Sequence, residues 1–142
     1  MVKDELSASL EDYLELICNL LEDSESVKAV EIARRLNVSR ASVSEALAKL
    51  AKKNLIYYEG HKGISITEEG LKKAKEVIEK HKTFSKFFEN ILGLEREEAM
   101  ENACKIEHVI SENLFEKIKS FQNFCEENPE LIANFRKGHI NE

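Results

Sequence analysis

Residues 28–67 constrain the fold more than any other part of the chain. Residues 28–36 and 40–53 both have the apolar spacing of an amphipathic helix, and only a short polar turn separates them. Two β-rich segments follow, residues 55–58 and 64–67, on either side of a turn that contains two glycines. Two helices joined by a short turn and followed by a two-stranded hairpin are typical of a winged helix-turn-helix.

The second helix of this pair carries short polar or basic side chains on the outer face of its N-terminal half. Such side chains can reach phosphate oxygens and base edges in a major groove, and Lys62 at the tip of the hairpin can reach backbone phosphates. An ordinary solvated helix capped by a serine is the alternative interpretation. We predict DNA contacts by Ser39, Arg40, Ala41, Ser42, Ser44, Glu45 and Lys62.

The distribution of charge agrees with nucleic-acid binding, although the net charge of the whole chain is −6. Residues 1–26 carry one basic and eight acidic side chains, and residues 64–142 carry twelve basic and sixteen acidic ones. Residues 27–63 carry eight basic and three acidic side chains, a net charge of +5. A basic segment between acidic ones is a local electrostatic footprint that the total conceals.

Helical periodicity also dominates the rest of the sequence. The expected helices cover residues 7–22, 68–92 and 95–110, and a last helix begins after Ser111 and ends at Pro129. The side chains that can cap these helices are those of Ser9, Thr67 and Ser111. In the last helix we expect an inward face made by Leu114, Ile118, Phe121 and Cys125.

The composition suits a helix-rich protein of one domain or two small ones. Hydrophobic residues make up 42% of the chain, and a single proline and five glycines leave long helices uninterrupted. The phenylalanines of residues 75–125 exceed what a solitary bundle of that size needs, which favours a subunit interface. We expect a mainly α fold with a small β wing, in which residues 1–74 form a winged helix-turn-helix domain and residues 75–142 form a helical dimerisation domain.

The sequence predicts a cytoplasmic protein that does not enter a membrane. No apolar run approaches the roughly 20 residues of a membrane span, and the charged N-terminus lacks the apolar core of a signal peptide. The three cysteines form no CxxC pair and no even disulfide framework, as is usual in a reducing compartment.

The pattern C-K-I-E-H places Cys104, Glu107 and His108 at the spacing i, i+3, i+4, which puts all three on one face of a helix. A thiol, a carboxylate and an imidazole that point the same way suit a transition-metal ion. Three ligands from one helix leave coordination positions open, so another part of the chain would complete the site. The alternative is an ordinary amphipathic helix in which the cysteine is a small buried residue.

Candidates for the missing ligands are acidic residues of the first helix and one histidine of the long helix. Asp12 and Glu15 are three residues apart and lie beside the apolar stripe of the first helix, where charge near the helix N-terminus is the alternative explanation. His81 falls on the apolar stripe of the long helix, and a lone histidine there is more often a packed core residue than a ligand.

The motifs, taken in order, cover nearly the whole chain. They are S-L-E-D-Y-L-E at 9–15, S-R-A-S-V-S at 39–44, G-I-S-I-T-E-E-G at 63–70, His81, and A-C-K-I-E-H-V-I-S at 103–111. In this order, the chain resembles the diphtheria-toxin-repressor and manganese-transport-regulator family of metal-activated transcriptional repressors. The resemblance is to the two-domain form, without the SH3-like C-terminal domain that iron-responsive members often carry.

The resemblance implies a metal-binding region between the DNA-binding part and the dimerisation part. Its ligands would be Asp12, Glu15, His81, Cys104, Glu107 and His108. The sequence mixes two branches of the family: the manganese branch has a glutamate at the position of Cys104, and the iron branch has a methionine at the position of Asp12. The expected function is a homodimeric repressor that binds palindromic operator DNA, is activated by Fe(II) or Mn(II), and controls genes of metal-ion homeostasis.

Three other functions fit the residues less well. A winged-helix regulator could sense an oxidant or an organic effector through Cys104, but a reactive thiol needs an electropositive setting and Glu107 argues against one. An enzyme built on Cys104 and His108 would lack an oxyanion donor and a glycine-rich elbow, so we expect no enzymatic activity. A pure protein-interaction module leaves the basic winged helix unexplained.

Overall fold

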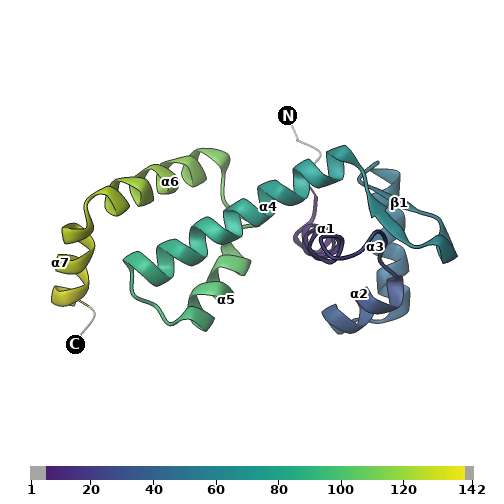
Figure 1. Cartoon of the computed structure of the whole chain (residues 1–142), viewed down its shortest axis with the longest axis horizontal. Coiled ribbons are helices and arrows are strands. Elements are labelled where there is room, and N and C mark those ends of the chain that lie inside the picture. Colours follow the sequence, from purple (N-terminus) through teal and green to yellow (C-terminus); the bar gives the residue numbers. More distant parts are fainter. Residues whose placement is uncertain (1–5, 140–142) are drawn as a thin grey trace. The chain divides into compact units, whose positions relative to one another are not determined.

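The computed structural model describes residues 6–139 and divides the chain into two compact units, Met1–Val77 and Ile78–Glu142 (Figure 1). Helices make up most of the described residues, and the one sheet among them has two antiparallel strands. The predicted fold class, mainly α with a small β wing, is therefore confirmed. No described helix is long and apolar enough to cross a membrane.

The first unit is a winged helix-turn-helix. Its helices are α1 (Ala8–Leu20), α2 (Ala29–Leu36), α3 (Arg40–Lys52) and the first part of α4 (Glu68–Lys86). Its strands are β1 (Ile56–Tyr58) and β2 (Ile64–Ile66), joined by the short 3-10 turn η1 (Gly60–Lys62). α2 and α3 pack against each other, and α3 also packs against α1 and β1. This packing holds the wing beside the second helix of the pair.

Apolar residues at helical spacing form the core of this unit. On α1 the buried side chains are those of Leu10, Tyr13, Leu14, Ile17 and Cys18. On α3 they are those of Val43, Ala46, Leu47 and Leu50. Burial raises the pKa of the Cys18 thiol, and the neighbouring Glu22 carboxylate adds to the increase. Cys18 is therefore an inert core residue rather than a reactive thiol.

Side-chain oxygens of serine and threonine residues cap the N-terminal ends of several helices. Ser39 Oγ accepts a hydrogen bond from the amide of Ser42 at 3.1 Å, and Ser111 Oγ accepts one from the amide of Leu114 at 3.1 Å. Both caps were predicted. Thr67, also predicted, accepts from the Gly70 amide at 2.9 Å while its hydroxyl donates to a backbone carbonyl at 2.8 Å. α4 is thereby anchored to the end of the winged domain.

The cap predicted for the first helix was wrong by two residues. Ser7, in an extended conformation, accepts a hydrogen bond from the Leu10 amide at 3.2 Å, so it is Ser7 rather than Ser9 that caps α1. Ser9 lies inside the first turn and is exposed. Both serines precede the apolar stripe, and only the true start of the helix distinguishes them.

The second unit is built from the end of α4 and four further elements. These are the π-helical turn η2 (Phe87–Ile91), α5 (Arg96–Ile106), α6 (Glu112–Glu127) and α7 (Pro129–His139). Phe84, Ala103 and Phe115 form its buried centre. η2 contacts α5, α6 and α7, so this widened turn lies at the centre of the unit.

The long helix of this unit ends where predicted, whereas two other predictions, the end of the next helix and the role of Pro129, were wrong. The long helix is regular only to Lys86 and continues as the π-helical turn, although it still ends before Gly93, whose φ is +80°. The helix expected to reach residue 110 ends at Ile106, because the chain must turn before Ser111 starts α6. Pro129 begins α7 instead of ending the pattern, since proline lacks the amide hydrogen that the first helical position does not need.

The predicted inward face of the last helix was correct only in part. Cys125 is buried and Ile118 is half-buried, but Leu114 and Phe121 are 46% and 52% exposed. Phe115 and Gln122, each one position further along the chain, are buried instead. α6 has apolar residues on two adjacent sides, and periodicity alone does not say which side packs inward.

Replacing Ser7 tests the cap of α1. We expect Ser7→Ala to lower the free energy of unfolding by about 1 kcal/mol, because the Leu10 amide loses its partner. The matched control Ser9→Ala should change it by less than about 0.5 kcal/mol. Urea unfolding followed by circular dichroism measures both, and an equal loss in the two variants would contradict this cap.

Candidate metal centre and nucleic-acid interface

The second unit brings together four of the six predicted metal ligands. His81 lies on α4, Cys104 lies on α5, and Glu107 and His108 follow directly after α5. One ligand atom each of Cys104, Glu107 and His108 lies within 4.8 Å of the others, and a similar spacing relates His81 and Glu107. Two segments that are far apart in the sequence therefore converge on the same carboxylate.

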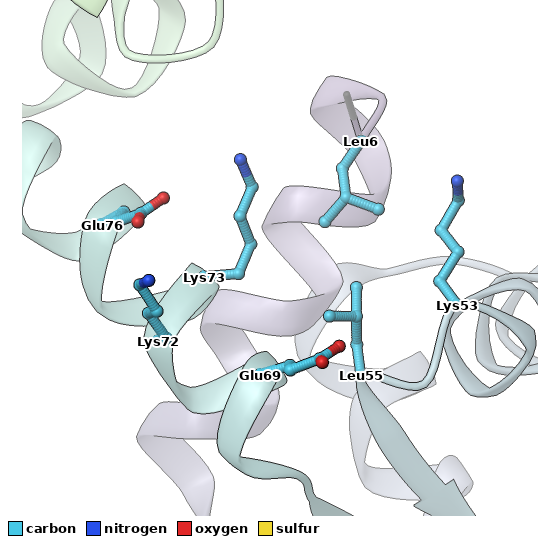
Figure 2. A pocket seen from close by; sticks show the side chains of 7 residues that line it. All are labelled: Leu6, Lys53, Leu55, Glu69, Lys72, Lys73 and Glu76. Carbon is cyan, nitrogen blue, oxygen red and sulfur yellow. The ribbon is translucent and has the colours of Figure 1, made fainter. Parts of the chain in front are cut away.

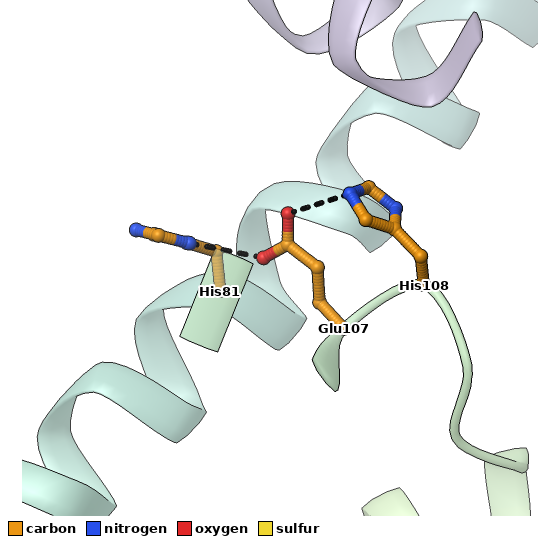
Figure 3. A network of polar contacts seen from close by, with 3 residues as sticks. All are labelled: His81, Glu107 and His108. Atoms are coloured by element: carbon orange, nitrogen blue, oxygen red, sulfur yellow. Dashed lines mark hydrogen bonds and ion pairs between the residues drawn. The ribbon is translucent and has the colours of Figure 1, made fainter. Parts of the chain in front are cut away.

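Glu107 lies between two imidazole rings (Figure 3). Its Oε2 is 3.0 Å from Nδ1 of His81, and its Oε1 is 3.4 Å from Nε2 of His108. The Glu107 side chain is fully buried, that of His108 is 7% exposed and that of His81 is 22% exposed. The centre is thus closed around the carboxylate and open to solvent at His81 and at Cys104, which is exposed.

Local backbone geometry keeps the spacing of C-K-I-E-H although the helix ends early. The Glu107 amide still donates to the carbonyl of Ala103 at 3.1 Å, as in a helix, and Glu107 itself has helical backbone angles. The Val109 amide then donates to the carbonyl of Ile106 at 3.1 Å and closes a turn. The three predicted ligands therefore remain on one side of the chain.

The donor set of this centre fits a divalent transition-metal ion. It offers a soft thiolate, a hard carboxylate and two imidazole nitrogens, which together suit manganese, iron or zinc better than calcium or magnesium. Oε1 of Glu107 is buried and accepts no hydrogen bond within residues 6–139. A buried carboxylate costs free energy unless charge or hydrogen bonds compensate it, and a bound cation provides that compensation.

The two acidic candidates of the first helix belong to the other unit. Asp12 and Glu15 lie three residues apart on α1, and both are half-buried beside its apolar stripe.

A surface pocket of about 310 Å³ in the first unit has a different chemistry (Figure 2). It is lined by Leu6, Lys53, Leu55, Glu69, Lys72, Lys73 and Glu76. Three ammonium groups and the absence of any cysteine or histidine from this lining do not suit a transition metal. The donors of the second unit are therefore the better metal candidates.

The residues predicted to contact DNA form an exposed surface on the first unit. Arg40, Ala41, Ser42, Ser44 and Glu45 are all exposed on the N-terminal half of α3. Ser39 has a structural role as well: besides capping α3, its hydroxyl donates to Ser42 Oγ at 2.9 Å. The Ser39 hydroxyl therefore already donates a hydrogen bond within the protein, and this contact with Ser42 was not predicted from the sequence.

On the wing, Lys62 forms an ion pair with Glu59 at 3.2 Å in which both side chains are about 70% exposed. Such exposed pairs contribute little to stability, so the ammonium of Lys62 can exchange this partner for a phosphate at small cost. His61 lies beside it, but its side chain is outside the described residues.

Comparison with protein families assigns both halves of the chain. Residues 5–64 match the model described as "Iron dependent repressor, N-terminal DNA binding domain". Residues 67–132 match the model described as "Iron dependent repressor, metal binding and dimerisation domain". The chain belongs to the iron-dependent repressor family. Members of this family are metal-dependent transcriptional repressors, and the predicted resemblance is confirmed.

Curated relatives are transcriptional regulators, a class of protein without enzymatic activity. An uncharacterised HTH-type transcriptional regulator of Methanocaldococcus jannaschii is 38% identical over 117 residues, which are 82% of this chain and 94% of that protein. The HTH-type transcriptional regulator MntR of Oceanobacillus iheyensis is 30% identical over 129 residues, 91% of this chain and 87% of that protein. Similarity to the family thus extends over almost the whole of both relatives.

Solved structures of the family have the same fold. A manganese-dependent transcriptional repressor in complex with manganese superposes with a TM-score of 0.74 at 28% identity, over 81% of this chain and 53% of that one. ScaR with bound Zn²⁺ superposes with a TM-score of 0.71 at 29% identity, over 81% of this chain and 54% of that one. The chain therefore spans about half the length of these solved repressors.

Removing the charge of Glu107 tests the candidate metal centre. We expect Glu107→Gln to weaken Co(II) binding at least about 100-fold, because a lost ligand should cost more than a lost outer-shell contact. Titration with Co(II), followed by the thiolate-to-cobalt charge-transfer absorption, measures the affinity. Glu101→Gln, which changes an exposed carboxylate on α5, is the control and should bind as the wild type does. Equal affinity in both variants would remove Glu107 from the centre.

Proposed function

We propose that this chain is a repressor that binds palindromic operator DNA as a homodimer when a divalent metal ion, Fe(II) or Mn(II), is bound. The observation that carries the proposal is the buried carboxylate of Glu107 between His81 and His108, beside the Cys104 thiol. These residues fall within the region that matches the family's metal-binding domain model. The genes it controls would be those of metal-ion homeostasis.

The proposed ligand set has six members from three segments of the chain. They are Asp12, Glu15, His81, Cys104, Glu107 and His108. Glu107 has two carboxylate oxygens directed to different imidazoles, so it can serve two neighbouring ions. In that arrangement His81 and Glu15 would complete one position, and Asp12, Cys104 and His108 the other. Cys104 would supply one sulfur ligand where a carboxylate would supply two oxygens. Binding of the second ion would therefore be weaker.

Binding would couple the two functional parts of the chain, proposed as residues 1–74 and 75–142. A bound divalent cation supplies positive charge among carboxylates and a thiolate that otherwise repel one another. Asp12 and Glu15 would then hold α1, and with it the winged helix, against the end of α5. In the dimer, this would fix the distance between the two α3 helices. Half-sites one helical turn apart, about 34–36 Å, would become reachable together.

DNA recognition would use the exposed surface of α3 and the wing. Arg40 is long enough to reach a phosphate or a guanine edge, while Ser42, Ser44 and Ala41 are small enough for close approach to the groove. Ser39 and the N-terminal amides of α3 would face a phosphate. Glu45 can accept a hydrogen bond from cytosine, and Lys62 would contact the backbone from the wing. The protein would act in the cytoplasm, where its operators lie.

The ligand set suits both proposed metals for different reasons. Asp12 and Glu15 contribute hard oxygen ligands, which favour manganese. Cys104 contributes a soft sulfur ligand, which favours iron. A DNA-binding titration under anaerobic conditions, with Fe(II) and Mn(II) added separately, decides between them.

Substitution of Asp12 tests the coupling between metal and DNA. We expect metal to strengthen operator binding by about 5- to 150-fold in the wild type, the usual range of allosteric coupling. Asp12→Ala should reduce this stimulation to about one-fold, because α1 then loses its only ligand to the position that Cys104 and His108 share and keeps Glu15 alone. Asp23→Ala, an exposed acid just after α1, should leave the stimulation intact. Fluorescence anisotropy with labelled operator DNA measures all three proteins, and unchanged stimulation in Asp12→Ala would contradict the proposed coupling.

A further inference from the structure

Charged side chains around one buried aromatic ring tie α4 to α6. Phe115 of α6 is 4% exposed, and the ammonium groups of Lys80 and Lys119 lie over its ring, 5.9 Å and 5.8 Å from the centroid. Each ammonium also meets a carboxylate of the opposite helix. Lys80 Nζ lies 2.7 Å from Glu112, and Lys119 donates a hydrogen bond to Glu79. We call these five residues the Phe115 clamp.

Lys80 is the most shielded charge of the Phe115 clamp. Ion pairs between exposed side chains contribute little to stability. The Lys80 side chain differs from such pairs because it is only 17% exposed and contacts both a carboxylate and an aromatic face. An aromatic ring attracts a partly desolvated cation more strongly than an exposed one. Lys80 therefore fixes the start of α6 against α4 more firmly than a surface ion pair would.

The Phe115 clamp lies directly beside two of the candidate metal ligands. Lys80 precedes His81 on α4, so the clamp and the imidazole occupy the same turn of that helix. Its partner Glu112 is the first residue of α6 and lies four residues after His108. The contacts of Lys80 thus join the segment that carries one histidine to the segment that carries the other.

A second tie between the same parts of the chain lies further from the metal candidates. The ring of Phe87, at the start of η2, packs against that of Phe121 on α6 with centroids 6.1 Å apart. Phe87 follows Lys80 by seven residues, which is roughly 10 Å along a helix. Without the Phe115 clamp, the start of α6 would be free to pivot about this distant contact, together with the turn that carries His108.

The clamp and the candidate ligands also share one hydrophobic core. Its members include the buried Phe84, Ala103 and Phe115 and the half-buried Ile106 and Ile110. Ala103 directly precedes Cys104, and Ile106 directly precedes Glu107. Because protein interiors are close-packed, a displaced Phe115 would displace these neighbours and with them the backbone that carries the ligands.

We propose that Lys80 is a positioning residue for the metal centre, because its contacts with α6 hold His108 at the distance from His81 that a bound ion requires. No member of the Phe115 clamp is among the six proposed ligands, so Lys80 acts through them. A site that is ordered before the ion arrives binds it more tightly than one that must be ordered by it. The inference rests on the proposed metal-dependent repressor and adds a determinant of its metal affinity.

The sign of one change separates positioning from two other roles of Lys80. An ammonium near a cation site repels the ion, so loss of a purely electrostatic Lys80 would tighten metal binding. Loss of a side chain that only stabilises the fold would lower the free energy of unfolding and leave the affinity of the folded protein unchanged. Loss of a positioning residue would weaken metal binding by the folded protein.

The test is a Co(II) titration of the whole chain, followed by the thiolate-to-cobalt charge-transfer absorption. We expect Lys80→Met to raise the dissociation constant about 10-fold, the lower end of the range for a lost outer-shell partner. Lys80→Arg should bind nearly as the wild type does, because a guanidinium can contact both the carboxylate and the ring. Lys119→Met, which removes the more exposed ammonium, should weaken binding to a smaller extent. Circular dichroism verifies that each variant is folded.

The matched control is Lys82→Met, which removes an exposed ammonium on the other side of His81 in the sequence. It should not weaken Co(II) binding. Unchanged or tighter binding by Lys80→Met, or an equal loss in Lys82→Met, would overturn the positioning role.

DNA binding by the same proteins separates this inference from the proposed function. If Lys80→Met binds Co(II) as the wild type does and metal stimulates DNA binding, the positioning role is wrong and the repressor function stands. If Lys80→Met binds Co(II) more weakly but no metal stimulates DNA binding by the wild type, the function is wrong and the positioning role stands. A wild-type chain that binds no Co(II) would overturn both.

Discussion

The rest of this structure's chemistry depends on a single buried carboxylate. Glu107 has no exposed side-chain surface, yet it lies at the end of a helix whose neighbouring residues are mostly polar. Burying a charge is unfavourable unless partners compensate it, and here two imidazoles on separate elements approach it from opposite sides. Burial of this carboxylate is unfavourable in an ordinary helical bundle, and a cation bound beside it would offset the unfavourable free energy.

The two units carry different kinds of functional side chain. The first unit concentrates basic and short polar side chains on α3 and the wing, while the second unit contains His81, His108 and the Cys104 thiol. Neither unit alone carries all six proposed ligands, because Asp12 and Glu15 lie on α1. Because the proposed ligands come from both units, binding of a metal ion to the full set would involve both units at once. That is the physical requirement for a repressor whose DNA affinity responds to metal.

Much of this architecture could be predicted from the sequence, because local signals agreed with tertiary packing. The helix pair, the hairpin and the caps at Ser39, Thr67 and Ser111 follow from turn chemistry and apolar period. Two of the predictions that failed involve positions where two local signals compete. Ser7 and Ser9 both precede the same stripe, and α6 has two adjacent apolar sides, of which one packs inward. For His81, the apolar period favoured a core residue and the family resemblance implied a ligand; in the structure its ring lies 3.0 Å from the Glu107 carboxylate.

The central claim is that an ion held at Glu107 also engages α1. Paramagnetic broadening of backbone amide signals tests it most directly, because Mn(II) broadens only nearby nuclei and Zn(II) provides a diamagnetic reference. The account predicts that substoichiometric Mn(II) broadens the amides of residues 12–15 together with those of residues 104–108, and that Zn(II) broadens neither set. Loss of the signals of residues 104–108 with those of residues 12–15 still sharp would contradict it.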